Sequence, residues 1–263
     1  YNMANYLVED TNPDTSIPGA NLIAGIGYIS GVKCMIMIDD SGIKAGAASE
    51  ATIDKALGCL DIALKQKLPC VHLVESAGVD LPNYSVKLWS KFGSVFYKKA
   101  KLSAAGIPVI AILHGFSTAG GAYQIGMSDY VIGVKGNGMA ALAGSALLKA
   151  ATGENASNSD IGGVEMHSVV TGSVEYLVND DAESIITVRK LIDQLNWNEN
   201  DAQKTTLNFE DPEYPIEDLA GIVPTDYSKG YDVREVIARL VDQSVFIELK
   251  PKYGISMVCA QAK

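Results

Sequence analysis

The sequence predicts an α/β fold in which mostly parallel strands form the interior and helices cover them. Short runs that are apolar throughout alternate along the chain with longer segments whose apolar residues recur at helical spacing. Strands of a parallel sheet are buried on both faces and therefore read as continuous apolar runs. Their alternation with helices is typical of the α/β class. With 263 residues, of which 48% are hydrophobic, the chain is long enough to enclose a large core.

The first elements are a strand hairpin and a helix. Residues 22–29 and 32–38 are two apolar runs separated by a short turn, which predicts the hairpin. Residues 50–67 carry apolar side chains at helical spacing, and the helix is expected to end before Pro69. Residues 70–74 then read as a buried strand.

The same order of strand and helix repeats in the middle of the chain. Residues 88–102 predict a second amphipathic helix, and residues 109–113 predict another apolar strand. A glycine-rich turn over residues 114–121 follows this strand and is expected to open a short helix through Gly126. Residues 130–134 are a further strand of the parallel set.

The last third of the chain is less regular. Residues 139–178 are rich in alanine and glycine and are left unassigned, whereas residues 179–195 predict a helix with acidic residues at its N-terminus. Residues 196–230 are polar and too long for an ordinary connection, so we expect a linker or an arm. Residues 232–242 predict a last amphipathic helix before a new strand pair, with a strand expected over residues 255–259.

Charge and composition exclude several classes of partner. Lys and Arg number 21 against 31 Asp and Glu, which gives a net charge of −10. A globally acidic chain is a poor partner for nucleic acid or for an anionic membrane surface. No apolar run approaches the roughly 20 residues of a membrane helix. Four cysteines lie in apolar stretches without a C-x-x-C pair, which predicts reduced, mostly buried thiols, no zinc ribbon and a cytoplasmic location.

Two glycine-containing turns follow neighbouring strands of the predicted sheet. One covers residues 114–122 and includes Gly120 and Gly121, and the other covers residues 75–78. Ligands gather outside the carboxyl ends of parallel strands, and paired glycines let a ligand approach backbone N–H groups closely. Each turn would supply an N–H group to one oxyanion. Close packing of a helix on a strand explains the glycines equally well.

A series of motifs in one order resembles a known family. Residues 116–123, with Met127-Ser128-Asp129 just after them, resemble the crotonase superfamily. Within it, they are similar to the carboxyltransferase subunit of biotin-dependent acyl-CoA carboxylases and decarboxylases. The further matching stretches are residues 23–27, 65–78, 148–154, 161–167 and 231–234. The resemblance covers nearly the whole chain.

The resemblance implies a crotonase-like spiral of ββα units. It divides the chain into an N-terminal carboxyltransferase domain over residues 1–195, the linker or arm over residues 196–230, and the start of a truncated second half over residues 231–263. The implied activity transfers a carboxyl group between carboxybiotin and the α-carbon of an acyl-CoA through enolates held in oxyanion holes. Because the second half is lacking, this chain alone is expected to be inactive.

The resemblance also implies site residues and partners. Gly120 and Gly121 would form an oxyanion hole with Gly78 nearby. The implied substrate-binding residues are Lys44, Gly46, Ser76, Ala77, Ala119, Ala122 and Gly144. The implied partners are acyl-CoA, a biotin carboxyl carrier, a biotin carboxylase and further copies of the chain, with the active site at a dimer interface. No metal is expected.

Some positions depart from the pattern of the family. Gly46-Ala47-Ala48 stands where Gly-Gly-Thr is usual, and Ser76-Ala77-Gly78 replaces Ser-Gly-Gly. Gly144-Ser145-Ala146 replaces Gly-Pro-Pro, and Ser168 stands where cysteine often follows the histidine. These departures bear on the acyl specificity and on whether the site is active.

Other functions remain open at this stage. A hydratase or isomerase of the same superfamily would need a carboxylate beside the oxyanion hole, but Tyr123 and Gln124 follow the glycine pair. A Clp-type protease would use Ser117 with His167 and Asp160 as partners. A decarboxylase subunit, or a scaffold that binds acyl-CoA without turnover, would share the motifs of the carboxylase.

Overall fold

A six-stranded sheet forms the centre of the molecule. The structure, a computed structural model, describes residues 20–83, 85–197 and 209–262. The strand order is β1 (Leu22–Ile29), β2 (Val32–Asp39), β3 (Cys70–Val74), β4 (Val109–Leu113), β6 (Tyr130–Val134) and β8 (Tyr176–Val178). Only β1 and β2 pair antiparallel, and every later pair is parallel. The predicted hairpin and the predicted class of sheet are confirmed.

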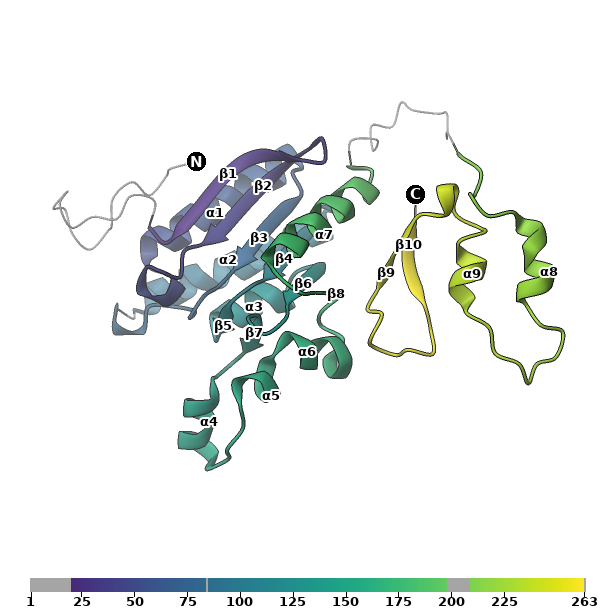
Figure 1. Cartoon of the computed structure of the whole chain (residues 1–263). Helices are drawn as coiled ribbons and strands as arrows, with labels where there is room; N and C mark the ends of the chain where they lie inside the picture. Colours follow the sequence, from purple (N-terminus) through teal and green to yellow (C-terminus); the bar gives the residue numbers. More distant parts are fainter. Residues whose placement is uncertain (1–19, 84, 198–208, 263) are drawn as a thin grey trace.

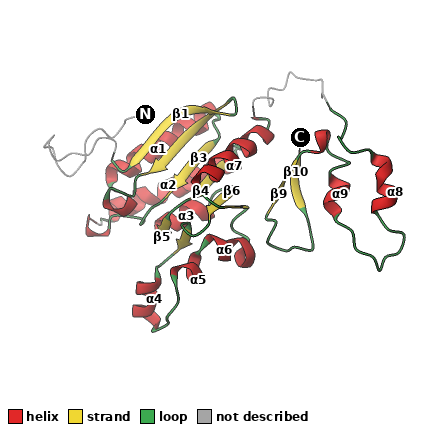
Figure 2. Ribbon diagram, viewed as in Figure 1, coloured by secondary structure: helices red, strands yellow, loops and turns green. Residues whose placement is uncertain are grey.

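Helices cover both faces of this sheet, as Figures 1 and 2 show. Helices α1 (Glu50–Gln66) and α2 (Val86–Ala104) pack on one face around a core that includes Met35 and Met37. Helix α7 (Asp181–Gln194) packs on the other face, against the isoleucines of β4 and β6. The three helices predicted from apolar spacing are thereby confirmed.

One strand of a small second sheet lies inside the predicted glycine-rich turn. Strand β5 (Phe116–Thr118) pairs in parallel with β7 (Met139–Ala141). Helix α3 (Gly120–Gly126) follows after one residue. The turn alone was therefore an incomplete prediction. Three residues are too few for an alternation of side chains to be recognised in the sequence.

The unassigned stretch before β8 consists of short elements. They are α4 (Ser145–Thr152), α5 (Asn158–Gly162), α6 (Val164–Met166) and the π-helical turn η3 (His167–Thr171). Short 3-10 turns also occur earlier in the chain, as η1 (Lys44–Gly46) and η2 (Leu81–Asn83).

The C-terminal part differs from expectation in two places. The described part of the expected linker contains η5 (Ile216–Asp218) and α8 (Leu219–Ile222), while residues 198–208 lie outside the described residues. The helix expected over residues 232–242 covers only α9 (Val233–Ile237), before the turn η6 (Asp242–Ser244). The strand expected over residues 255–259 was wrong, because β10 covers Cys259–Ala262, antiparallel to β9 (Phe246–Leu249).

The β9–β10 hairpin packs on the part of the chain that carries the six-stranded sheet, here called the main domain. Gln261 Nε2 donates to the Tyr130 hydroxyl at 2.7 Å, and Lys250 Nζ lies 3.2 Å from a Glu175 carboxylate oxygen. Ile247 and Leu249 pack against the core on the α7 side of the sheet. The two polar contacts join residues 75 and 131 positions apart, which no local pattern in the sequence predicts.

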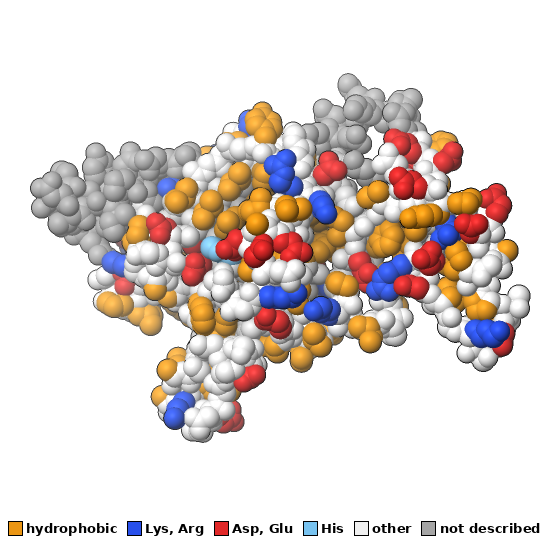
Figure 3. Space-filling model, viewed as in Figure 1, with side chains coloured by type: hydrophobic (Ala, Val, Ile, Leu, Met, Phe, Trp, Pro, Cys, Tyr) orange, Lys and Arg blue, Asp and Glu red, His pale blue; other side chains and the backbone are white. Residues whose placement is uncertain are grey.

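The thiols and the surface agree in part with expectation. Cys34, Cys59 and Cys70 are buried and Cys259 is exposed, which agrees with the prediction of mostly buried thiols. Figure 3 shows acidic side chains interspersed with lysine and arginine on the viewed face, without an extended basic patch. Among the described residues, no helix is both long enough and apolar enough to span a membrane.

Candidate functional site

The turn that follows β3 is packed directly against η1. A Cβ atom at Gly46 would lie 2.2 Å from the Glu75 carbonyl oxygen, so only glycine fits this approach. Ser76 Oγ donates to the Gly46 carbonyl at 2.9 Å, and the Ala77 N–H donates to the Ala45 carbonyl at 3.1 Å. Two loops far apart in the sequence therefore form one unit.

The glycine turn before α3 lies on the same unit. The Thr118 N–H donates to the Ser76 carbonyl at 2.9 Å, and a Cβ at Gly121 would lie 2.3 Å from that carbonyl oxygen. A Cβ at Gly78 would lie 3.1 Å from the Gly120 nitrogen. The structure thus brings together the three glycines that the sequence singles out.

The backbone N–H groups of these glycines differ in availability. The first N–H groups of a helix have no acceptor within it. The structure records no acceptor for the N–H of Gly120 or Gly121 among the residues it describes. The Gly78 N–H instead donates to Ser76 Oγ at 3.2 Å. Two adjacent N–H donors at the start of α3, just after β5, are suited to an oxyanion.

Ala119 holds the entry to α3 in an unusual conformation. Its φ of 50° is uncommon for a residue with a side chain. The Ala119 N–H donates to the Ala141 carbonyl at 3.0 Å, and its own carbonyl accepts from the Ala122 N–H at 3.2 Å. Backbone strain of this kind persists where surrounding contacts impose it, and such places are often functional sites.

Aromatic side chains wall the site on the side of α2. A Cβ at Gly120 would lie 2.3 Å from the Phe92 ring. The Phe92 and Phe96 rings are 5.0 Å apart, and Phe96 is 5.4 Å from the half-exposed Tyr123 ring. This wall gives the two donors a partly apolar surrounding, in which hydrogen bonds to a charged oxygen are stronger than in water.

Lys44 and Gly144 lie differently from the glycine cluster. Lys44 Nζ is 3.0 Å from the buried Asp80 carboxylate, which ties η1 to the chain two residues after Gly78. Burial raises the pKa of Asp80, but hydrogen bonds from Asn83 and Lys44 outweigh it, so the net pKa is below the usual value. Gly144 is the N-cap of α4, and no hydrogen bond of the described residues links it to the cluster.

The protease hypothesis was wrong. Ser117 is fully buried, and its hydroxyl has no partner among the described residues. The two ring nitrogens of His167 are engaged by the Ala140 carbonyl at 2.8 Å and the Thr171 hydroxyl at 2.9 Å. Asp160 caps α5 through Ser157. His167 and Asp160 therefore serve local structure, and the three residues form no triad.

Sequence reasoning missed a buried charged group beside the site. Lys99 on α2 is fully buried, and burial lowers its pKa to about 8. His72 is also buried, and its hydrogen-bond partner is Asp39. The signal for Lys99 was present, since it continues the helical spacing of Phe92, Val95 and Leu102 on the buried face of α2.

Metal ligation is not indicated by the side chains that the structure describes. Among residues 20–83, 85–197 and 209–262, no three His, Cys, Asp or Glu residues are grouped so that they would hold an ion. That the protein works without a metal stays a prediction.

Comparison with known proteins gives one consistent family. The carboxyl transferase domain matches residues 2–263. The β chain of mitochondrial methylcrotonoyl-CoA carboxylase from Dictyostelium discoideum is 41% identical over 249 residues, which are 94% of this chain and 42% of the relative. The biotin-dependent 3-methylcrotonyl-coenzyme A carboxylase β1 subunit from Mycobacterium tuberculosis is 40% identical over 248 residues, or 94% and 47%.

Solved structures support membership of the same family. The β subunit of Pseudomonas aeruginosa geranyl-CoA carboxylase is 40% identical, with a TM-score of 0.67 over 100% of this chain and 48% of that one. The transcarboxylase 12S hexamer with hydrolysed methylmalonyl-coenzyme A is 29% identical, with a TM-score of 0.85 over 95% and 48%. These likenesses confirm the predicted crotonase-like fold. The chain spans about half the length of the curated relatives it matches.

Proposed function

The chain belongs to the carboxyl transferase family, and on that premise we propose that it forms the acyl-CoA half of a biotin-dependent carboxyltransferase. The protein of which it is part transfers a carboxyl group between carboxybiotin and the α-carbon of a CoA thioester. Carboxybiotin, carried by a partner protein, supplies the activated carboxyl group. What this chain adds is a place where the thioester oxygen is bound as negative charge develops on it.

The adjacent N–H groups of Gly120 and Gly121 carry this proposal. They have no acceptor among the described residues, and they follow a strand that ends beside the Ser76 turn. Loss of a proton from the α-carbon turns the thioester carbonyl into an enolate oxygen. Donors held in place before the reaction stabilise such an oxygen by roughly 3–4 kcal/mol for each donor. The N–H of Gly78 already donates to Ser76 Oγ, so Gly78 contributes only through its close approach to Gly120.

The remaining substrate contacts belong to the same proposal. Lys44, paired with Asp80, lies in the loop that packs on the Ser76 turn and is assigned to the phosphates of coenzyme A. The other implied contacts are Gly46, Ser76, Ala77, Ala119, Ala122 and Gly144. Gly144 has the least support among them, because no hydrogen bond of the described residues links it to the glycine cluster.

Partners and setting follow from the family in the same way. The transcarboxylase 12S relative is described as a hexamer and a multienzyme core. We assign to this protein a biotin carboxyl carrier, a biotin carboxylase and further copies of the subunit, with the site completed at a dimer interface. The inactivity of this chain alone is part of the proposal. So is the cytoplasmic location, although the Dictyostelium relative is named as mitochondrial.

Calorimetric titration with acetyl-, propionyl- and a longer acyl-CoA tests the proposal. The wild-type chain is expected to bind one of them best. Gly121→Ala is expected to lose binding, because its Cβ would lie 2.3 Å from the Ser76 carbonyl oxygen and push the turns apart. Gly126→Ala, on the same helix, is the matched control, since a Cβ at Gly126 would meet no atom within 4 Å. Equal binding by both variants would exclude the glycine turn as the site.

A further inference from the structure

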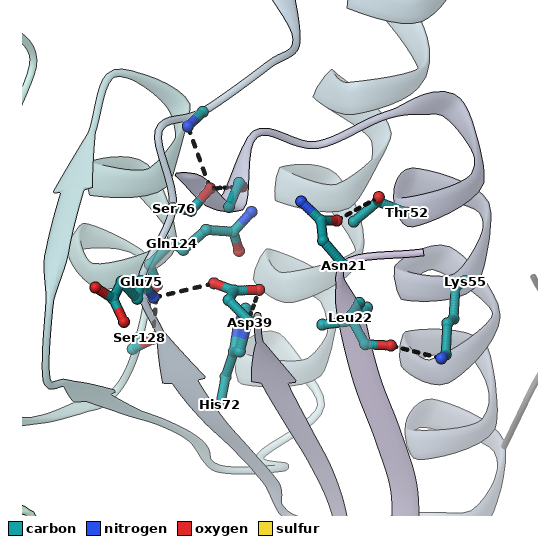
Figure 4. A network of polar contacts seen from close by, with 12 residues as sticks. Asn21, Leu22, Asp39, Thr52, Lys55, His72, Glu75, Ser76, Gln124 and Ser128 are labelled. Atoms are coloured by element: carbon teal, nitrogen blue, oxygen red, sulfur yellow. Dashed lines mark hydrogen bonds and ion pairs between the residues drawn. The ribbon is translucent and has the colours of Figure 1, made fainter. Parts of the chain in front are cut away.

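A buried row of charged and polar groups runs beneath the two glycine turns. It consists of Asp39 at the end of β2, His72 on β3 and Lys99 on α2, here called the Asp39–Lys99 row. His72 Nε2 lies 3.1 Å from Asp39 Oδ1, and Lys99 Nζ lies 3.5 Å from His72 Nδ1. Lys99 is fully buried, His72 is 5% exposed, and the Asp39 side chain is 11% exposed. Figure 4 shows Asp39 and His72 in this arrangement.

The roles of donor and acceptor along the row follow from its two ends. A lysine ammonium group only donates hydrogen bonds, so His72 Nδ1 accepts from Lys99. His72 Nε2 then carries the proton and donates to the Asp39 carboxylate. With an ammonium group at one end and a carboxylate at the other, the two ends of the row carry opposite charges. Compensation is what allows charges to remain buried.

Each end of the row also holds one of the two turns. Asp39 Oδ2 accepts from the Glu75 N–H at 3.2 Å, immediately before Ser76. Lys99 Nζ donates to the Gln124 carbonyl at 3.3 Å, on the helix whose first residues are Gly120 and Gly121. Both elements that form the candidate oxyanion hole are therefore attached to the same row.

Apolar packing leaves this region incompletely filled. A cavity of about 40 Å³ lies between α1, α2 and β3, and its polar lining is supplied by Asp39, Thr52, His72, Ser76 and Gln124. Gln124 is 7% exposed, and its side-chain oxygen has no partner among the described residues. Figure 4 shows its side chain between Ser76 and Asp39. Close packing does not fill the space beside the turns at this point, so the polar contacts of the row support their spacing there.

We propose that Asp39 is a positioning residue which, through the Glu75 N–H and together with Lys99 on the Gln124 carbonyl, keeps the Ser76 turn and the start of α3 at the spacing that an oxyanion requires. Asp39 acts through the backbone and does not touch the substrate. This inference rests on the proposed function, because it assigns the row to the same oxyanion site.

The test separates binding of the carbonyl oxygen from binding of the rest of coenzyme A. The full chain is titrated with an acyl-CoA thioester and with the S-alkyl-CoA thioether of equal length, which lacks the carbonyl oxygen. The ratio of the two affinities measures how well the two N–H groups are placed. In Asp39→Asn and Lys99→Met we expect this ratio to fall by roughly tenfold, the effect of losing a well-placed hydrogen bond. The thioether affinity is expected to stay unchanged.

Lys55→Met is the matched control. Lys55 is also a buried lysine that donates to a backbone carbonyl, that of Leu22, but it lies on α1. Its variant is expected to keep the wild-type ratio even if it is less stable. A merely structural role of the row would lower stability in all three variants and leave the ratio unchanged in each. If Asp39→Asn does not fold, Asp39→Glu takes its place in the measurement of the affinity ratio, because it keeps the charge but displaces the carboxylate.

The outcomes distinguish the two proposals. A wild-type chain that binds thioester and thioether equally would refute the oxyanion role of the glycines, and with it the proposed function. A wild-type chain that prefers the thioester, together with Asp39 and Lys99 variants that keep the preference, would overturn the inference and leave the proposed function standing. Loss of the preference in those variants alone supports both.

Discussion

At the scale of single residues, Lys99 determines a pH dependence of stability. A pKa lowered by burial from 10.5 to about 8 corresponds to about 3 kcal/mol of unfavourable charge burial, present in full below pH 8. Between pH 8 and about 10.5 the unfolded chain holds the proton while the folded chain has lost it. The unfolded state then binds more protons, so this residue makes stability rise with pH across that window.

Lys99→Met removes this contribution. We expect the free energy of unfolding of the variant, relative to that of the wild type, to be highest at neutral pH and to decline as the pH rises above 8. Urea denaturation of both proteins between pH 7 and about 9.5 measures the difference. The carboxylate of Asp39 and the thiol of Cys70, whose pKa burial raises to about 11, interact with Lys99 and are present in both proteins.

Lys101→Met is the control for this pH series. Lys101 lies on the same helix but is exposed, so its replacement should give a difference that does not vary with pH. A wild-type to Lys99→Met difference that is constant from pH 7 to 9.5 would contradict a lowered pKa at Lys99.

At the scale of elements, the start of α1 depends on a pair of side chains that cap it. Ser49 accepts from the Thr52 N–H, and Thr52 Oγ1 accepts from the Ser49 N–H. Thr52 Oγ1 also donates to Asn21 Oδ1 at 2.6 Å, which ties the helix to the entry of β1. We expect Ser49→Ala to lower the free energy of unfolding by about 1–2 kcal/mol, measured by urea denaturation.

A second capping pair provides the comparison. Ser157 and Asp160 cap α5 in the same way, but α5 has only five residues and these side chains are exposed. Ser157→Ala should cost distinctly less than Ser49→Ala, because the end of a short surface helix unfolds locally without loss of the core. An equal loss in the free energy of unfolding for Ser49→Ala and Ser157→Ala would contradict an effect of burial on the strength of the cap.

At the scale of the whole molecule, the β9–β10 hairpin is held by a contact that only glycine permits. Gly172 ends the π-helical turn with a φ of +66°, and a Cβ there would lie 2.9 Å from the Tyr253 ring. Gly172→Ala is expected to displace Tyr253 and loosen the hairpin from the main domain. Faster hydrogen exchange at the amides of β9 would report this loosening.

Gly136→Ala separates backbone strain from the contact. Gly136 has a similar φ of +74°, but a Cβ there meets no atom within 4 Å. Both variants carry the strain of a left-handed alanine, roughly 1 kcal/mol. Only Gly172→Ala should accelerate exchange in β9, and the same acceleration in both variants would exclude the Tyr253 contact as its cause.

The sequence by itself determined the order of the strand–helix units and the identity of the glycine turns. Apolar runs and helical spacing depend on neighbours in the chain, so β3, α1 and α7 could be read locally. The motifs around residues 116–123 likewise pointed to the family that the comparisons support. Where the local pattern is short, as in β5, or irregular, as before β10, prediction failed.

Only the tertiary structure decided which groups meet and what they can do. That Gly78 approaches Gly120, that its N–H is already used, and that Lys99 meets His72 and Gln124 depend on segments up to 42 residues apart coming together. Helical spacing places Lys99 on the buried face of α2, but the local sequence does not say which groups meet it there. Those groups are set by the elements packed against the helix, because burial and pairing are properties of the assembled core.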